Sequence, residues 1–227
     1  MATTTAAPTW NGIWDDIYRS RPWGKYPKEE LIRFVARNYY SAPDRSKVRF
    51  LDLGCGFGSS TWFLAREGFV VDAIDGSAVV IERLSKRMKD ERLSARLLAG
   101  DIVDLPYPAQ SFDCVVDIAC LMCNTPEDSK RILDGVFERL KPGGKLFSIS
   151  ATPASWGATS GKKVADSTYR DLTEGAFANT GTVRFSSEQQ IKELYSKFSN
   201  LNIGLSEYSV GDKSHLVSNW VIEGSKA

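Results

Sequence analysis

A glycine-rich loop that follows an apolar run constrains the fold of this chain more than any other feature. Residues 50–61 read FLDLGCGFGSST, with glycine at positions 54, 56 and 58. Glycine tolerates positive φ and lets another group approach the main chain with no Cβ in the way. Such a loop between a strand and a helix predicts an open α/β sheet that binds its ligand beyond the carboxyl end of the strand.

Apolar runs alternate with helical spacing from residue 48 onward. The expected strands are Val48–Leu53, Val70–Ile74, Ala95–Leu98, Phe112–Ile118 and Lys145–Ile149. The expected helices between them are Ser59–Glu67, Ala78–Lys89 and Glu127–Leu140. This alternation predicts a doubly wound α/β fold, in which helices cover both faces of a mostly parallel sheet.

The end of the chain reads as a helix and a hairpin. Helical spacing covers Ser187–Phe198, and two strand-like runs follow at Leu201–Val210 and His215–Glu223. The four-residue polar turn GDKS joins these runs. We therefore expect an antiparallel hairpin that completes the sheet.

Two segments outside this pattern are predicted to cover the ligand site. Residues 151–183 are rich in Ala, Thr, Ser and Gly and show weak periodicity, which indicates an inserted substrate loop or lid. Residues 1–47 form an aromatic-rich segment ahead of a main domain at 48–227. This segment is either a hydrophobic cover over the helices or a helical lid that shields a cation from water. Its candidate lid residues are Trp14, Tyr18, Trp23 and Tyr26.

Two aspartates narrow the choice of ligand. Asp75 ends the second expected strand, and Asp101 follows the third in LLAGDI. Both belong at the same edge of a parallel sheet. Asp75 can accept hydrogen bonds from two ribose hydroxyls, and Asp101 from an exocyclic amine, with the amide of Ile102 facing a ring nitrogen. The glycine spacing does not fit the NAD fingerprint, and no G-K-[ST] of a Walker loop follows it.

The motifs LDLGCGFGSS, AIDGS, AGDIVDLPYPAQSFDCVVD and LKPGGKLFSIS follow one another within residues 48–150. In order and spacing they resemble the class I S-adenosylmethionine-dependent methyltransferases. The resemblance implies the Rossmann-like methyltransferase fold, with seven strands in the order 3-2-1-4-5-7-6 and the last strand antiparallel. It also implies S-adenosyl-L-methionine as the cofactor.

The resemblance further implies roles for matching positions. Gly54 and Gly56 would border the methionine moiety of the cofactor. Asp75 would bind the ribose, and Asp101 with Ile102 would bind the adenine.

Two more aspartates receive roles on the same basis. Asp52 would brace the glycine loop or reach the amino group of the cofactor through water. The chain around Asp117–Ala119 would close the methionine side. The complete set of expected cofactor-binding residues is Asp52, Gly54, Cys55, Gly56, Asp75, Gly76, Ser77, Asp101, Ile102 and Asp117.

The resemblance and the composition together predict methyl transfer to a small-molecule acceptor through an oxygen, nitrogen, carbon or sulfur nucleophile. No NPPY-type loop for amide or adenine nitrogen follows the fourth strand, where the chain reads DIACLMCNTPED. The net charge of +1 gives no basis for binding nucleic acid or an anionic membrane, and the sequence indicates no oligomeric state. A non-catalytic module that binds S-adenosylmethionine is the alternative, followed by a nucleotide-dependent oxidoreductase.

His215, the only histidine, is the candidate general base. It begins the last expected strand on the ligand rim, and imidazole can accept a proton near neutral pH. A half-exposed histidine at a strand end is the simpler interpretation. Tyr18 and Tyr26 are the other candidates for handling the proton.

The cysteines indicate neither a metal site nor a disulfide framework. CLMC at 120–123 has the spacing of a zinc knuckle, but no second Cys or His pair exists in the sequence, so we expect no metal. The start MATTTAAPTW lacks the pattern of a signal peptide, and no apolar run approaches the length of a membrane span. A cytoplasmic location is therefore expected.

Overall fold

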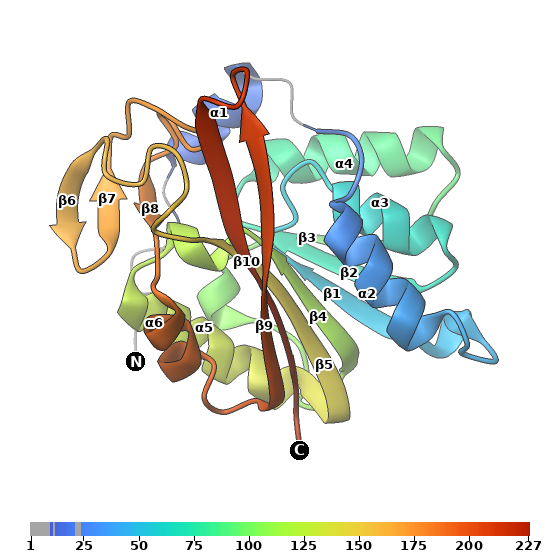
Figure 1. Ribbon diagram of the computed structural model, residues 1–227. Helices are drawn as coiled ribbons and strands as arrows, with labels where there is room; N and C mark the ends of the chain where they lie inside the picture. The colour runs from blue at the N-terminus through green and yellow to red at the C-terminus, as the bar shows by residue number, and fades with distance from the viewer. Residues whose placement is uncertain (1–9, 11, 21–23) are drawn as a thin grey trace, which may run out of the picture.

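A seven-stranded sheet forms the centre of the molecule in a computed structural model, which describes residues 10, 12–20 and 24–227 (Figure 1). The strand order is β3-β2-β1-β4-β5-β10-β9. β10 runs antiparallel to both β5 and β9, and the other neighbouring pairs are parallel. This confirms the predicted order, because β9 and β10 are the sixth and seventh strands of the sheet along the chain. The strands are β1 Arg49–Leu53, β2 Val70–Asp75, β3 Arg96–Ala99, β4 Phe112–Ile118, β5 Leu140–Ala151, β9 Ser199–Val210 and β10 His215–Ser225.

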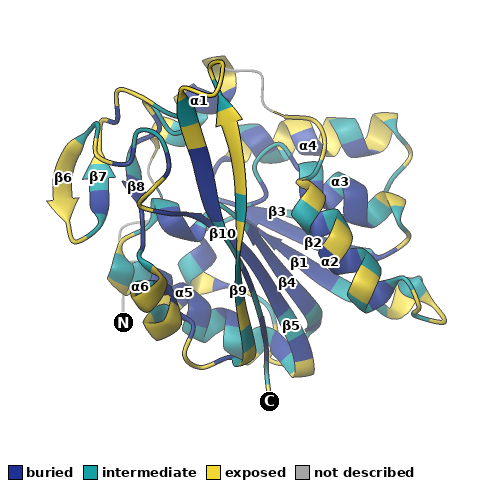
Figure 2. Ribbon diagram, viewed as in Figure 1, coloured by how far each residue is buried: buried dark blue, intermediate teal, exposed yellow. Residues whose placement is uncertain are grey.

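Three apolar clusters hold the helices on the two faces of this sheet. On one face, side chains of β1, β2, β4 and β5 pack against α2 and α3, and β2 and β3 pack against α4. On the other face, the same central strands pack against α5 and α6. Figure 2 shows that the central strands are buried, as parallel strands covered on both faces must be. The helices are α1 Ile13–Ser20, α2 Glu29–Tyr39, α3 Ser59–Arg66, α4 Ala78–Asp90, α5 Pro126–Arg139 and α6 Glu188–Leu194.

Capping residues fix where several helices begin. The Thr125 side chain accepts a hydrogen bond from the Asp128 amide, and Pro126 follows it at the first position of α5. Ser187 and Gln190 form a reciprocal capping box at the start of α6. α6 ends at Leu194, four residues earlier than the helical spacing predicted.

The segment 151–183 is more ordered than its sequence indicated. It contains β6 Lys162–Ala165 and β7 Thr168–Arg170, which form a three-stranded antiparallel sheet with β8 Thr182–Arg184. Strands of three or four residues are too short to show a periodic pattern, so the sequence did not reveal them. Buried Leu172 packs this small sheet onto the region after β4.

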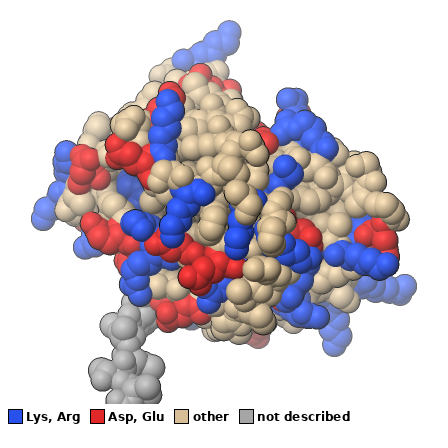
Figure 3. Space-filling model, turned by 90° about the horizontal axis from the view of Figure 1, so that it is seen from below, with Lys and Arg blue, Asp and Glu red and all other residues tan. Residues whose placement is uncertain are grey.

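Charged side chains of both signs are mixed on the face shown in Figure 3, with no large area of one sign. Three short 3-10 helices complete the described structure: η1 Arg45–Lys47, η2 Ile102–Asp104 and η3 Leu121–Cys123. Among the helices described, none combines the length and the apolarity that a membrane span requires.

A buried ion pair joins β1 to β2 at the end of the sheet away from the glycine loop. Both guanidinium contacts of Arg49 to the Asp72 carboxylate are short, at 2.8 and 2.9 Å, and Asp72 is 2% exposed. We expect Arg49→Met to lower the free energy of unfolding by about 3 kcal/mol or more, because a buried carboxylate then loses its close partner.

Chemical denaturation of three variants tests this expectation. The double variant Arg49→Met/Asp72→Leu should be more stable than Arg49→Met alone, since it removes the unpaired charge as well. If the double variant loses as much stability as the two single variants combined, the ion pair does not carry the effect.

Candidate functional site

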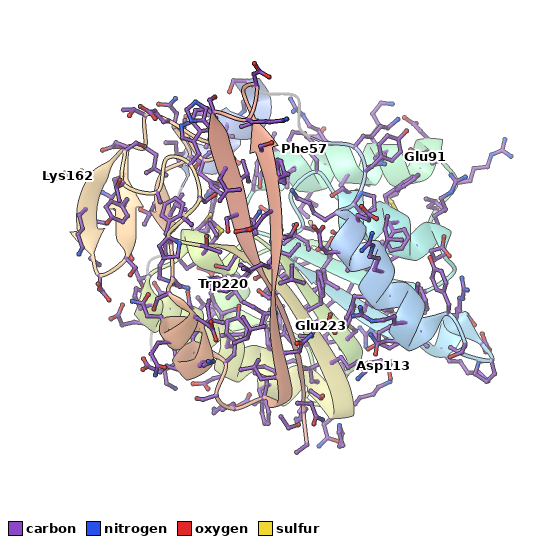
Figure 4. All side chains as sticks on the ribbon, viewed as in Figure 1. Phe57, Glu91, Asp113, Lys162, Trp220 and Glu223 are labelled. Atoms are coloured by element: carbon purple, nitrogen blue, oxygen red, sulfur yellow. The ribbon has the colours of Figure 1, made fainter. Side chains whose placement is uncertain are left out.

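A cavity of about 300 Å³ lies at the carboxyl ends of β1, β2 and β4. Its walls come from the loop after β1, the start of η2, the chain from the end of β4 through η3, α1, the inserted segment and β10. Figure 4 shows Phe57 of the glycine loop at this end of the sheet, whereas Asp113 and Glu223 mark the opposite end. The cavity therefore occupies the crevice where an open α/β sheet binds its ligand.

The glycine loop has the backbone geometry that the sequence predicted. Gly54, Gly56 and Gly58 have φ of +62°, +51° and +71°, which non-glycine residues rarely adopt. A Cβ on Gly54 would lie 2.1 Å from Sγ of Cys120, so this loop packs directly on the chain after β4. Any larger residue at position 54 would push the two cavity walls apart.

Asp75 connects the end of β2 to the glycine loop. Its carboxylate accepts hydrogen bonds from the amides of Gly56 and Ser77, both at 2.9 Å. Burial raises the pKa of Asp75, and these two hydrogen bonds oppose that rise. Each carboxylate oxygen thus receives one main-chain donor and retains acceptor capacity at the cavity wall.

Asp52 is tied to the helix that follows the glycine loop, and its two predicted roles, bracing the loop or reaching the cofactor through water, stay predictions. It is 2% exposed, and its carboxylate accepts a hydrogen bond of 2.6 Å from the Thr61 hydroxyl in α3. Burial raises the pKa of Asp52 to about 7, with the Thr61 hydrogen bond acting in the opposite direction.

Asp117 shapes the cavity from behind its wall rather than lining it. The fully buried carboxylate accepts hydrogen bonds from the amides of Cys120 and Leu121 at 2.9 and 3.0 Å, and from the Ser148 hydroxyl at 2.5 Å. Burial raises its pKa to about 6. The lining residues at this point are Ile118, Ala119 and Cys120, which belong to the stretch expected to close the methionine side. The cofactor-binding role of Asp117 stays a prediction.

The residues expected around an adenine divide in a similar way. Ile102 lines the cavity. Asp101 does not line the cavity. Its carboxylate caps η2 by accepting a hydrogen bond of 3.0 Å from the Val103 amide. Gly76 lines the cavity and packs against Trp10, whose ring would meet a Cβ on Gly76 at 2.5 Å. Ser77 is fully buried and caps α4.

The helix α1 covers this end of the cavity. Ser77 donates a hydrogen bond to Asp15, and Arg83 of α4 donates one to the carbonyl of Tyr18. The Tyr18 ring meets Phe57 edge to face at 5.2 Å, and its hydroxyl lies 3.4 Å from where a Gly56 Cβ would be. Burial, and next the Asp75 charge, raise the pKa of Tyr18, which favours the protonated hydroxyl. Its role in proton transfer stays a prediction.

The other candidates for proton transfer, Tyr26 and His215, are not among the residues that line the cavity. Tyr26 is 70% exposed and packs against Trp62 at 5.7 Å. His215 begins β10 as predicted, but its ring stacks on Trp156 with centroids 4.0 Å apart. The proposed lid residue Trp23 lies outside the described residues. A base role for His215 stays a prediction.

Three of the four cysteines line the cavity as neutral thiols. Burial raises the pKa of Cys55 and Cys120 well above the ordinary value, and that of Cys123 to about 12. All four cysteines are free. Within the described part of the chain, no three His, Cys, Asp or Glu side chains are grouped so as to hold a metal ion.

Several lining residues were not identified from the sequence. Phe57, Asn124, Phe177 and Asn219 come from four separate segments that only the folded chain brings together. Asn219 left a weak signal, because it is an amide within the otherwise largely apolar run LVSNWVI.

Residues 50–144 match the family described as a methyltransferase domain. The cypemycin N-terminal methyltransferase of Streptomyces sp is 35% identical over 112 residues, 47% of this chain and 43% of that protein. A ubiquinone biosynthesis O-methyltransferase of Coxiella burnetii is 32% identical over 127 residues, 56% of this chain and 53% of that protein. The chain thus spans about half the length of these curated relatives.

Solved structures share the fold over most of the chain. A protein that converts a disulfide bond into a thioacetal group during echinomycin biosynthesis has a TM-score of 0.71 at 18% identity, covering 94% of this chain and 90% of its own. The cyclase SpnF has a TM-score of 0.61 at 17% identity, and the match covers 93% of this chain and 90% of SpnF. At such low identity these structures show the fold alone.

The raised pKa of Asp52 makes stability depend on pH. Its folded value of about 7 exceeds the value of about 3.9 for an unperturbed aspartate, so the folded state binds more protons between these values. Stability should therefore fall as pH rises from about 4 to 7. We expect Asp52→Asn to flatten this fall by about 3 kcal/mol, because the two pKa values differ by about three units, one unit corresponds to about 1.4 kcal/mol, and the two ends of the titration lie outside this pH range. The amide oxygen of the new Asn side chain can still accept the Thr61 hydrogen bond.

Urea denaturation across this pH range measures the effect. Asp90→Asn, an exposed change on α4, is the control and should leave the slope unaltered. An unchanged slope in Asp52→Asn would show that Asp52 is ionised in the folded protein throughout this range.

Proposed function

Residues 50–144 form a methyltransferase domain of the class I type, whose cofactor is S-adenosylmethionine, and from this premise we propose that the protein methylates a small-molecule acceptor. The observation that supports this best is the shared cavity. It joins the glycine loop and Asp75 to a wall that includes Phe177 and Asn219, both outside the matched residues. Cofactor and acceptor can thus meet in one enclosed space.

The residues around the glycine loop fit the cofactor. Asp75 keeps acceptor capacity for the ribose hydroxyls while two main-chain amides hold its carboxylate in place. The amide of Ile102, at the cavity wall, suits the edge of an adenine ring. Gly54 and Gly56 line the cavity without a side chain, and the methionine moiety would lie against them. When bound, S-adenosylmethionine supplies a methyl group that its sulfonium makes electrophilic.

The protein's own contribution is alignment and exclusion of water. Trp10, Trp14 and Tyr18 cover the cavity with aromatic faces, which attract a cation such as a sulfonium. The contacts of Ser77 with Asp15 and of Arg83 with the Tyr18 carbonyl hold this cover on α4. A fixed, dry site favours direct attack by the acceptor atom on the methyl group.

The small-molecule character of the acceptor rests on the size of the cavity, about 300 Å³, and on the named activity of a relative. The named activity of the Coxiella burnetii relative, ubiquinone biosynthesis O-methylation, concerns a small molecule, whereas that of the Streptomyces relative concerns the N-terminus of cypemycin. The mixed surface charge in Figure 3 gives no footprint for nucleic acid on that face. A cytoplasmic location is part of the proposal, since four free cysteines suit a reducing compartment.

A non-catalytic module that binds the cofactor is the second candidate. The cyclase SpnF has the same fold and is named for a reaction other than methyl transfer, so the fold is compatible with this second candidate. Transfer of a labelled methyl group from S-adenosylmethionine to a pool of small metabolites separates the two. Labelled product supports the enzyme. Tight cofactor binding with no product from any pool supports the module, and binding of NAD instead supports an oxidoreductase.

We expect Asp75→Ala to weaken S-adenosylmethionine binding by about 1.5 to 3 kcal/mol, because the ribose hydroxyls lose a charged acceptor. Isothermal titration measures the affinity, and thermal unfolding reports whether the variant is folded. Asp90→Ala on the exposed end of α4 is the matched control. Equal affinity of a folded Asp75→Ala variant and the unaltered protein would remove Asp75 from the cofactor site.

A further inference from the structure

Asn219 is a buried amide on the cavity wall. It lies in β10, opposite Ala151 of β5 and Ser206 of β9, and only 7% of its surface is exposed. The next residue, Trp220, donates a hydrogen bond of 2.8 Å to the Ser186 carbonyl on the α6 side (Figure 4). Because successive side chains of a strand alternate between faces, Asn219 lies on the opposite face, where it lines the cavity.

The Asn219 side chain makes no hydrogen bond within the described part of the protein. Two other polar side chains that line the cavity form hydrogen bonds within their own loop. Asn124 donates to the Cys120 carbonyl at 2.9 Å, and the Cys123 thiol donates to the Ala119 carbonyl at 3.3 Å. A polar side chain that borders a cavity and makes no hydrogen bond within the protein is available to pair with a ligand, and Asn219 is such a side chain.

The surroundings of this amide restrict what it can pair with. Ala119, Ile149, Ala176 and Phe177, which line the cavity together with Asn219, are apolar. The two carboxylates of the cavity, Asp52 and Asp75, belong to the cofactor side and hold hydroxyl and main-chain donors. Lys28 is the one Lys or Arg among the described residues that line the cavity. It is exposed, and its ammonium lies 5.8 Å from the centre of the Tyr208 ring. A charged acceptor would therefore find no buried counter-charge beside Asn219.

We propose that Asn219 binds the methyl acceptor, and that the acceptor is an uncharged, mainly apolar molecule with a carbonyl or amide group. The Asn219 amide would hydrogen-bond that group while Phe177 and Ile149 contact the apolar part. The pairing sets the position of the acceptor and discriminates against analogues that lack the polar group. This inference rests on the proposed function, since it assigns the substrate of the same cavity.

The first experiment asks whether Asn219 serves the fold or a ligand. Asn219→Leu keeps the volume and removes the amide, so its melting temperature should equal or exceed that of the unaltered protein. Its affinity for S-adenosylhomocysteine should not change. Asn124→Leu is the matched control and should lower the melting temperature, because it breaks the bond to Cys120. A drop for Asn219→Leu as large as for Asn124→Leu would overturn the ligand role.

The second experiment uses benzamide and toluene as probes, added to the protein saturated with S-adenosylhomocysteine and followed by NMR titration. We expect the unaltered protein to bind benzamide about 10-fold more tightly than toluene, and Asn219→Leu to lose this preference. Equal preference in both proteins would overturn the proposal. Loss of the preference in a protein that methylates no metabolite would support Asn219 as a ligand residue and reject methyl transfer. An acceptor found by methyl transfer whose KM is unaltered by Asn219→Leu would reject Asn219 alone.

Discussion

Three buried aspartates at the carboxyl ends of adjacent strands organise the functional end of this protein. Asp52, Asp75 and Asp117 end or nearly end β1, β2 and β4, and each is at most 7% exposed. Main-chain amides and hydroxyl groups, rather than cationic side chains, donate the hydrogen bonds that these carboxylates accept. Donors of this kind come with fixed backbone geometry, so each aspartate fixes the loop that follows a strand.

The cavity and the ion pair that stabilises the sheet lie at opposite ends of the strands. The Arg49–Asp72 pair ties β1 to β2 at one end, where a full ion pair can be buried without obstructing a site. At the other end burial raises the pKa of Asp52 and Asp117, and hydrogen bonds from hydroxyl groups and, for Asp117, main-chain amides oppose the rise.

The acceptor side follows a different design. Its wall is apolar, its thiols are neutral, and most of its hydrogen-bonding groups are used within their own loops. α1 and the connection between β7 and β8 contribute residues around the cavity, from outside the matched residues 50–144.

The sequence by itself determined the sheet, its order through the family resemblance, and the glycine loop at the carboxyl end of β1. Positive φ at Gly54 and Gly56 and a carboxylate at the end of β2 are local requirements, and a single stretch of chain can express them. Only the tertiary structure decided which aspartates line the cavity, since Asp117 turns its carboxylate toward the amides behind the wall.

The tertiary structure alone also decided the acceptor side. Strands β6 to β8 are too short for a periodic signal, and Phe177 and Asn219 lie far apart in the chain. His215 reached the strand end that its position predicted, yet its stacking on Trp156 depends on a loop 59 residues earlier. Side-chain direction at such positions results from packing between distant segments, and no pattern within one segment encodes it.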